Sequence, residues 1–91
     1  MDESQALAEI KRLTMLRRVS LTAHAKTRMR ERGVTVRDLL AAIISATTAR
    51  HEDEHKYRVE GGIDEDGDPL TIVVAIEADL LVITIFCIWG T

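Results

Sequence analysis

Four side chains suited to phosphate chemistry recur at helical spacing within nine residues. His24, Arg28, Glu31 and Arg32 stand at positions i, i+4, i+7 and i+8, on one side of an α-helix. Phosphodiester cleavage needs a group that exchanges protons near neutral pH, which an imidazole supplies. It also needs fixed cations for the charge that develops on the phosphoryl oxygens, which arginine supplies. The spacing fits equally a structural role, in which His24 packs against a sheet and Arg28 and Glu31 form surface ion pairs.

The net charge of −3 hides a division between the two halves of the chain. Residues 1–50 hold ten Lys and Arg against five Asp and Glu, whereas residues 51–91 hold two against ten. Within residues 11–37 there are nine bases and one acid, Glu31. Such asymmetry is typical of a cationic face for a nucleic acid. It is also compatible with basic helices that neutralise acidic loops of the same fold.

The residues that carry this chemistry are expected on the second of three helices. Apolar residues recur at three- and four-residue steps and predict a first amphipathic helix over about residues 4–18. Ser20 or Thr22 can cap the second helix, and Gly33 supplies the left-handed residue that commonly ends one. Thr35 begins the third, which is expected to fade near residues 47–48.

After the helices the hydrophobic pattern changes to that of strands. Residues 56–62 alternate and predict a half-exposed strand. Residues 70–76 and 80–88 are nearly uncharged and rich in β-branched side chains, which is typical of well-covered strands. Connections this short allow only antiparallel neighbours. Residues 48–53 are a candidate for one more strand.

The whole chain is predicted to form one α+β domain over residues 1–91. An N-terminal helix (1–19) and the motif helices (20–47) precede an antiparallel sheet (48–91). We expect two to three N-terminal helices packed on one face of a three- or four-stranded antiparallel sheet.

Composition excludes several classes of protein. One cysteine, Cys87, allows no intramolecular disulfide framework and fits a reducing compartment. The acidic opening, residues 1–4, lacks the basic region of a secretory signal. The longest uncharged apolar run, residues 80–89, is too short to span a bilayer. A cytoplasmic location with no membrane partner is therefore expected.

One stretch of the chain is similar to a known family. Residues 21–34, Leu-Thr-Ala-His-Ala-Lys-Thr-Arg-Met-Arg-Glu-Arg-Gly-Val, resemble the signature H-A-x-x-R-M-x-E-R-G-[IV] of the bacterial domain-of-unknown-function family 4258. The resemblance continues through a third helix, a strand with Tyr57 and Arg58, a turn with Gly67 and a closing strand with Thr84.

The resemblance implies a fold and an activity. The family has been grouped with the barnase–EndoU–colicin–RelE-like ribonuclease toxins, which consist of helices followed by an antiparallel sheet. That grouping implies metal-independent RNA cleavage without a cofactor, and an antitoxin or immunity protein as partner. A shared fold does not by itself establish a shared function.

The resemblance also implies roles for individual residues. It transfers His24, Arg28 and Arg32 as polar site positions, joined by Thr84 from the last strand and by Tyr57 or Arg58 from the first. The chemistry of these side chains makes His24 a general acid or base, Arg28 and Arg32 phosphate clamps, and Thr84 a donor of a hydrogen bond to substrate. Lys26, Tyr57 and Arg58 would contact RNA. Thr84 fits equally a strand residue satisfied locally, and Arg32 a charge that complements the helix dipole.

Two features weaken the prediction of an enzyme. The aromatic residues are only Tyr57, Phe86 and Trp89, and the last two lie in an apolar run where core packing is expected, so few remain to stack on bases. The other histidines, His51 and His55, lie in an acidic segment that repels RNA.

Two metal motifs fail on their context. Residues 51–55 read H-E-x-x-H, the zinc pattern, but a strand follows within two residues and the segment is almost wholly charged. Asp64, Asp66 and Asp68 resemble a calcium loop, but Pro69 and Ala75 stand where glycine and glutamate are required. No metal site is predicted.

The alternative function is non-catalytic. The first helix and the apolar residues 85–89 can act as partner surfaces. If the last strand lies at the sheet edge, it favours homodimerisation or capture of a partner strand. The domain would then be a protein-interaction or dimerisation module.

Overall fold

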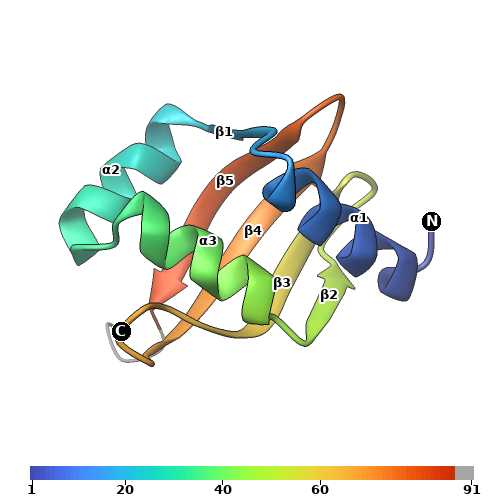
Figure 1. Cartoon of the computed structure of the whole chain (residues 1–91). Coiled ribbons are helices and arrows are strands. Elements are labelled where there is room, and N and C mark those ends of the chain that lie inside the picture. The colour runs from blue at the N-terminus through green and yellow to red at the C-terminus, as the bar shows by residue number, and fades with distance from the viewer. Residues whose placement is uncertain (88–91) are drawn as a thin grey trace.

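Three helices and five strands make up the part of the chain that the structure, a computed structural model, describes, residues 1–87 (Figure 1). In chain order they are α1 (Glu3–Met15), β1 (Val19–Leu21), α2 (Ala23–Arg32), α3 (Val36–Ser45), β2 (Thr48–His51), β3 (Lys56–Ile63), β4 (Pro69–Ile76) and β5 (Leu80–Cys87). The predicted strand residue Ile88 and the predicted core residue Trp89 lie outside the described residues.

The helices begin and end at the residues whose chemistry favours a cap. Thr22 caps α2, and Gly33 ends it with a left-handed φ of 68°. Thr35 caps α3 and forms a capping box with Asp38. These boundaries confirm the prediction, whereas α1 ends three residues before the expected position, because Arg17 turns the chain with a φ of 60°.

The sheet has five strands in the order β1-β5-β4-β3-β2, so the expectation of three or four is wrong. Strands β2 to β5 form the predicted antiparallel meander. The additional strand, β1, pairs parallel to β5 from Val19↔Leu80 to Leu21↔Val82. A parallel pair is possible here because the connection from β1 to β5 contains most of the domain. Strand β5 is therefore not an edge strand where β1 accompanies it.

The helices pack on one face of the sheet, as expected (Figure 1). Helix α3 lies against β3 and β4, α1 against β2, and α2 against β5. The core consists of apolar side chains from all three helices and from the inner side of the strands. Its largest fully buried members include Ile10, Leu13, Leu39, Ile43, Ile72 and Ile85.

An irregularity in β5 decides which of its side chains face the helices. Ile83 has no Cα partner on β4, because its neighbours Val82 and Thr84 pair with consecutive residues of β4. As a result Val82 and Ile85 are both fully buried, while Phe86 is 39% exposed. The expectation that Phe86 packs in the core is wrong.

The opposite face of the sheet, here called the open face, carries no helix formed by residues 1–87. Arg58 of β3 pairs in register with Val73, and Phe86 of β5 pairs with Thr71. The Arg58 guanidinium lies 5.4 Å from the centre of the Phe86 ring. This contact crosses the middle strand and explains why Thr71 and Val73 are buried on a face without helices.

Candidate functional site

Helix α2 is fixed to the sheet at its first turn. The backbone N–H of Thr22 donates to the carbonyl oxygen of Val82 at 3.0 Å. Its hydroxyl donates to the carbonyl oxygen of Ile83 at 2.9 Å and accepts from the N–H of Ala25 at 3.0 Å. One threonine therefore ends β1, caps α2 and holds both against β5.

The two sides of α2 differ sharply. Ala25 and Met29 are buried, and both belong to the core. His24 and Lys26 are exposed, and Arg28 is half-buried. Because His24 and Arg28 are four residues apart, they lie one turn apart on the same flank of the helix. The structure thus places the imidazole of His24 and the guanidinium of Arg28 on one flank of α2, where His24 is exposed and Arg28 half-buried.

Arg28 carries an unsatisfied polar atom. Its Nε is buried and has no hydrogen-bond partner among the described residues. A buried donor without a partner costs about 1–3 kcal/mol. The folded state bears this cost unless a bound molecule accepts the hydrogen bond.

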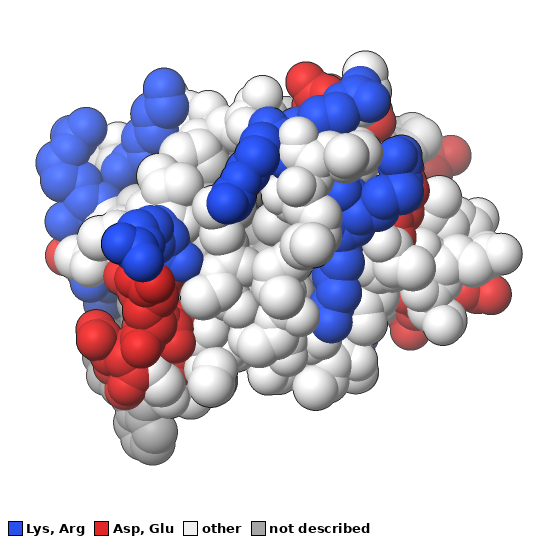
Figure 2. Space-filling model, in the orientation of Figure 1, with Lys and Arg blue, Asp and Glu red and all other residues white. Residues whose placement is uncertain are grey.

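Three further cations lie along the same helix. Lys26 and Arg30 are exposed and form no ion pair with any described residue. Arg32 is exposed in the last turn. Figure 2 shows these basic side chains as blue surface over α2, while red surface gathers over the β3–β4 hairpin. The basic side chains of α2 are therefore set apart from the acidic hairpin, whereas Arg18 and Arg37 pair with acids of the second half of the chain.

Thr84 and Arg58 come together on the open face. Each pairs in register with Val73, so they stand on either side of β4 in one row. Arg58 forms an ion pair with Glu52 in addition to its contact with Phe86. This pair of predicted residues lies on strands and not on the α2 flank.

Tyr57 occupies a different place from that expected of a residue in contact with RNA. It faces the helices, is 5% exposed and belongs to the core. Its ring centre lies 4.5 Å from that of His51. The sequence did not predict the exposure of Phe86, which adds an aromatic ring to the open face. This exposure results from the irregularity at Ile83, and no sequence signal marks Ile83.

The histidines of the zinc-like motif are not on a helix. His51 ends β2, and its N–H donates to the carboxylate of Glu3 at 2.8 Å. Residues 52–55 form bends before β3 begins. The helical geometry that the motif requires is therefore missing from this segment.

Three carboxylates cluster beside the start of α3. Asp38, Asp64 and Asp66 each place an oxygen within 4.8 Å of the others. Asp38 accepts the N–H of Thr35 at 3.0 Å and the N–H of Glu65 at 3.1 Å, while Asp64 accepts those of Asp66 and Asp68 at 2.9 Å. The N–H of Thr35 is the largest influence on Asp38 and lowers the pKa of its carboxyl, against the opposing effect of burial. The cluster therefore has a structural role: Asp64 holds the β3–β4 turn together, and Asp38 joins that turn to α3.

The fold and site define a class, an α+β domain with a basic helix fixed to one end of its sheet. Residues 21–87, which run from the last residue of β1 through that helix to the end of β5, match the family described as Domain of unknown function (DUF4258). The chain belongs to this family. Neither a curated protein nor a solved structure matches the chain. No helix in the described residues has the length and apolar character to cross a membrane.

Proposed function

We propose that this domain binds RNA through the flank of α2 that carries His24 and Arg28. The observation that carries the proposal is the buried, unpartnered Nε of Arg28. A phosphate oxygen accepts charge-assisted hydrogen bonds from guanidinium nitrogens, so a bound phosphodiester would satisfy this atom once the half-buried side chain turns outward. Lys26 and Arg30, which have no ion pair with a described residue, extend the cationic surface along the helix.

The proposal includes metal-independent cleavage at the same flank. The 2′-hydroxyl of RNA attacks the adjacent phosphorus, the P–O2′ bond forms and the P–O5′ bond breaks. His24 takes the proton from the 2′-hydroxyl or gives one to the leaving 5′-oxygen, with water completing the other transfer. Arg28, one turn away, stabilises the charge on the phosphoryl oxygens, and Arg32 extends the clamp.

The open face supplies a second set of contacts in this proposal. Thr84 offers a hydroxyl, Arg58 a cation, and Phe86 a ring for stacking on a base. Tyr57 is left out because its side chain is buried in the core. Uncontrolled RNA cleavage harms the cell that carries it, so an antitoxin or immunity protein remains the proposed partner.

Binding is tested by titrating labelled single-stranded RNA over a series of salt concentrations. We expect the affinity to fall steeply with salt, with each lost phosphate contact reducing the log–log slope by about 0.7. Arg28→Ala and Lys26→Ala should each weaken binding and flatten the slope. Arg12→Ala, which removes an exposed cation paired with Glu9 on α1, is the matched control and should change little. Salt-independent binding, or equal loss in the control, would contradict the proposed site.

Cleavage is tested separately on the same RNA with EDTA present. Wild type should cleave RNA but not the same sequence as DNA, which lacks the 2′-hydroxyl. His24→Ala should abolish cleavage while retaining a cooperative unfolding transition and most of the RNA affinity. Salt-dependent binding without cleavage would reject the enzyme and keep the binding function.

A further inference from the structure

Helix α3 is apolar on two sides, although it packs on the sheet with only one. Leu39, Ala42 and Ile43 are fully buried against the sheet. The outer side also carries apolar residues, and Ile44 on that side is 40% exposed. A helix that is apolar all round normally lies buried, so the outer side of α3 lacks a cover among the described residues.

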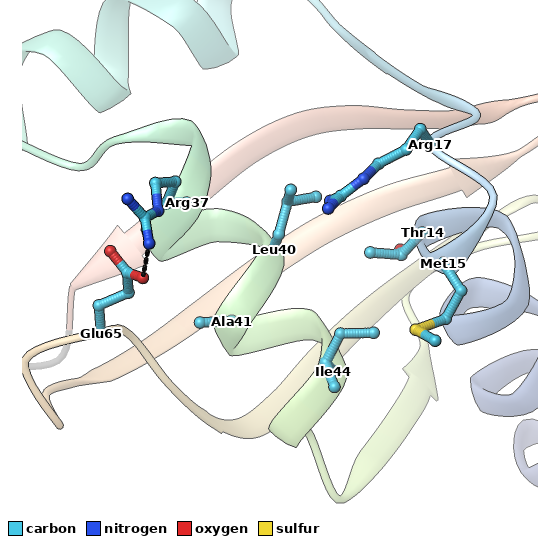
Figure 3. Close-up of a pocket in the computed structure, with 8 residues that line it drawn as sticks. All are labelled: Thr14, Met15, Arg17, Arg37, Leu40, Ala41, Ile44 and Glu65. Atoms are coloured by element: carbon cyan, nitrogen blue, oxygen red, sulfur yellow. Dashed lines mark ion pairs between the residues drawn. The ribbon is translucent and has the colours of Figure 1, made fainter.

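The exposed side of α3 forms one wall of a groove. The end of α1 forms the other wall, and the groove encloses about 400 Å³. Figure 3 shows Leu40, Ala41 and Ile44 along α3, with Met15 directed toward Ile44 from the end of α1. Met15 is 70% exposed, so its side chain is available to a partner.

Cations stand at both ends of this apolar floor. Arg17 follows α1 in the left-handed conformation, and its side chain extends over the groove toward Leu40 (Figure 3). Its guanidinium forms no ion pair with a described residue. Arg37 at the start of α3 is paired with Glu65 at 3.4 Å, but its side chain is 82% exposed. Figure 2 shows the resulting surface, white in the centre, with blue above it and to its right and with blue next to red at its left.

We propose that this groove docks an amphipathic helix of a partner protein, with apolar side chains on one face and carboxylates at its borders. The outer residues of α3 repeat at helical spacing, which suits a helix laid along it. The carboxylates would pair with Arg17 and Arg37. A second copy of the chain fits less well, because a symmetric contact would bring the cations of the two grooves together. RNA fits less well because the floor is apolar.

The site is independent of the proposed RNA surface, since none of the residues that line the groove belongs to α2. The two proposals can therefore fail separately. A variant of the groove should leave RNA binding unchanged, and a variant of the α2 flank should leave docking unchanged.

The probe is a pair of labelled amphipathic helical peptides about four turns long. Both carry the same leucines on one face, and they differ only in having Glu or Lys at the bordering positions. We expect saturable binding of the acidic peptide, at least about tenfold tighter than the basic one, and weaker at high salt. Anisotropy measures binding, and light scattering measures the molar mass of the free chain.

Two variants locate the binding site, and a third serves as control. Ile44→Glu should lower the affinity for the acidic peptide at least about tenfold. Arg17→Asn replaces the cation by a neutral residue that tolerates the left-handed conformation. This variant should bind the acidic peptide more weakly and with a smaller dependence on salt. Ala8→Glu adds the same charge at an exposed position of α1 outside the groove and should change nothing. The proposal would be overturned if the wild type bound neither peptide or bound both equally. It would also be overturned if Ile44→Glu bound the acidic peptide as the wild type does, or if the wild type were a dimer that Ile44→Glu dissociates.

Discussion

The hydroxyl of Thr22 donates a 2.9 Å hydrogen bond to the carbonyl oxygen of Ile83 and accepts a 3.0 Å hydrogen bond from the N–H of Ala25. The same side chain thus caps the basic helix and ties it to the irregular position of β5. That position also sets the direction of Thr84 and Phe86. The geometry of α2 and of the open face therefore depends on one pair of residues separated by 61 positions in the sequence.

Replacement of Thr22 should test this connection. Thr22→Val keeps the shape but removes both hydrogen bonds, and we expect the free energy of unfolding to fall by about 1–2 kcal/mol. Thr22→Ser retains the hydroxyl and should lose less than half as much. Urea unfolding followed by circular dichroism measures both. Equal loss in the two variants would show that the methyl group, and not the hydroxyl, fixes α2.

Gly62 allows α3 to approach β3 closely. A Cβ at this position would lie 1.9 Å from the carbonyl oxygen of Ala42, which is backbone and cannot move aside. We expect Gly62→Ala to lower the free energy of unfolding by about 3 kcal/mol or more. Gly67→Ala places a Cβ in open space, where only its left-handed φ of 86° costs energy, and should lose about 1 kcal/mol. A Gly62→Ala variant as stable as Gly67→Ala would contradict the close packing.

The sequence predicts the helices and the meander because their signals are local. Thr22, Gly33 and the Thr35–Asp38 box each mark a helix boundary with residues that contact one another within a turn. The alternation of apolar and polar residues over 56–62 likewise indicates which side chains lie on each side of β3. Tyr57 and Val59 are buried on one side of β3, and Arg58 lies on the other.

Two features escape prediction because their causes lie far away in the chain. Strand β1 has three residues, no turn signal of its own, and a partner that begins about sixty residues later. The direction of Phe86 depends on the irregularity at Ile83. Strict alternation from buried Val82 would turn Thr84 and Phe86 toward the helices, and the additional residue reverses both. Nothing in an apolar run of β-branched residues marks where that shift occurs.

Asp38 should make the stability depend on pH in a defined direction. The N–H of Thr35 holds the pKa of its carboxyl below the ordinary value, so the carboxylate stabilises the fold above that ordinary value. This contribution is lost as the pH falls through the lowered pKa of the folded state. Asp38→Asn should therefore cost about 1 kcal/mol near neutral pH, and the difference from wild type should shrink in acid.

Urea unfolding over a series of pH values measures the effect of Asp38→Asn. Asp66→Asn removes a neighbouring acid of the same cluster whose side chain accepts no hydrogen bond from a described residue, and it should cost nothing at any pH. A loss in Asp38→Asn that stays constant from neutral to acidic pH would show that shape, and not charge, explains its contribution.

Arg28 should show a conflict between stability and function. Its buried Nε has no partner, so Arg28→Met, which keeps an unbranched side chain without the polar group, should raise the free energy of unfolding by about 1 kcal/mol. The same change should weaken RNA binding at least about tenfold, because the phosphate loses its guanidinium. Arg30→Met, an exposed position on the same helix, should leave stability nearly unchanged. Urea unfolding and RNA titration on the same preparations distinguish the outcomes. A destabilised Arg28→Met would mean that the guanidinium serves the fold, and a stabilised variant that still binds RNA as wild type does would remove Arg28 from the proposed site.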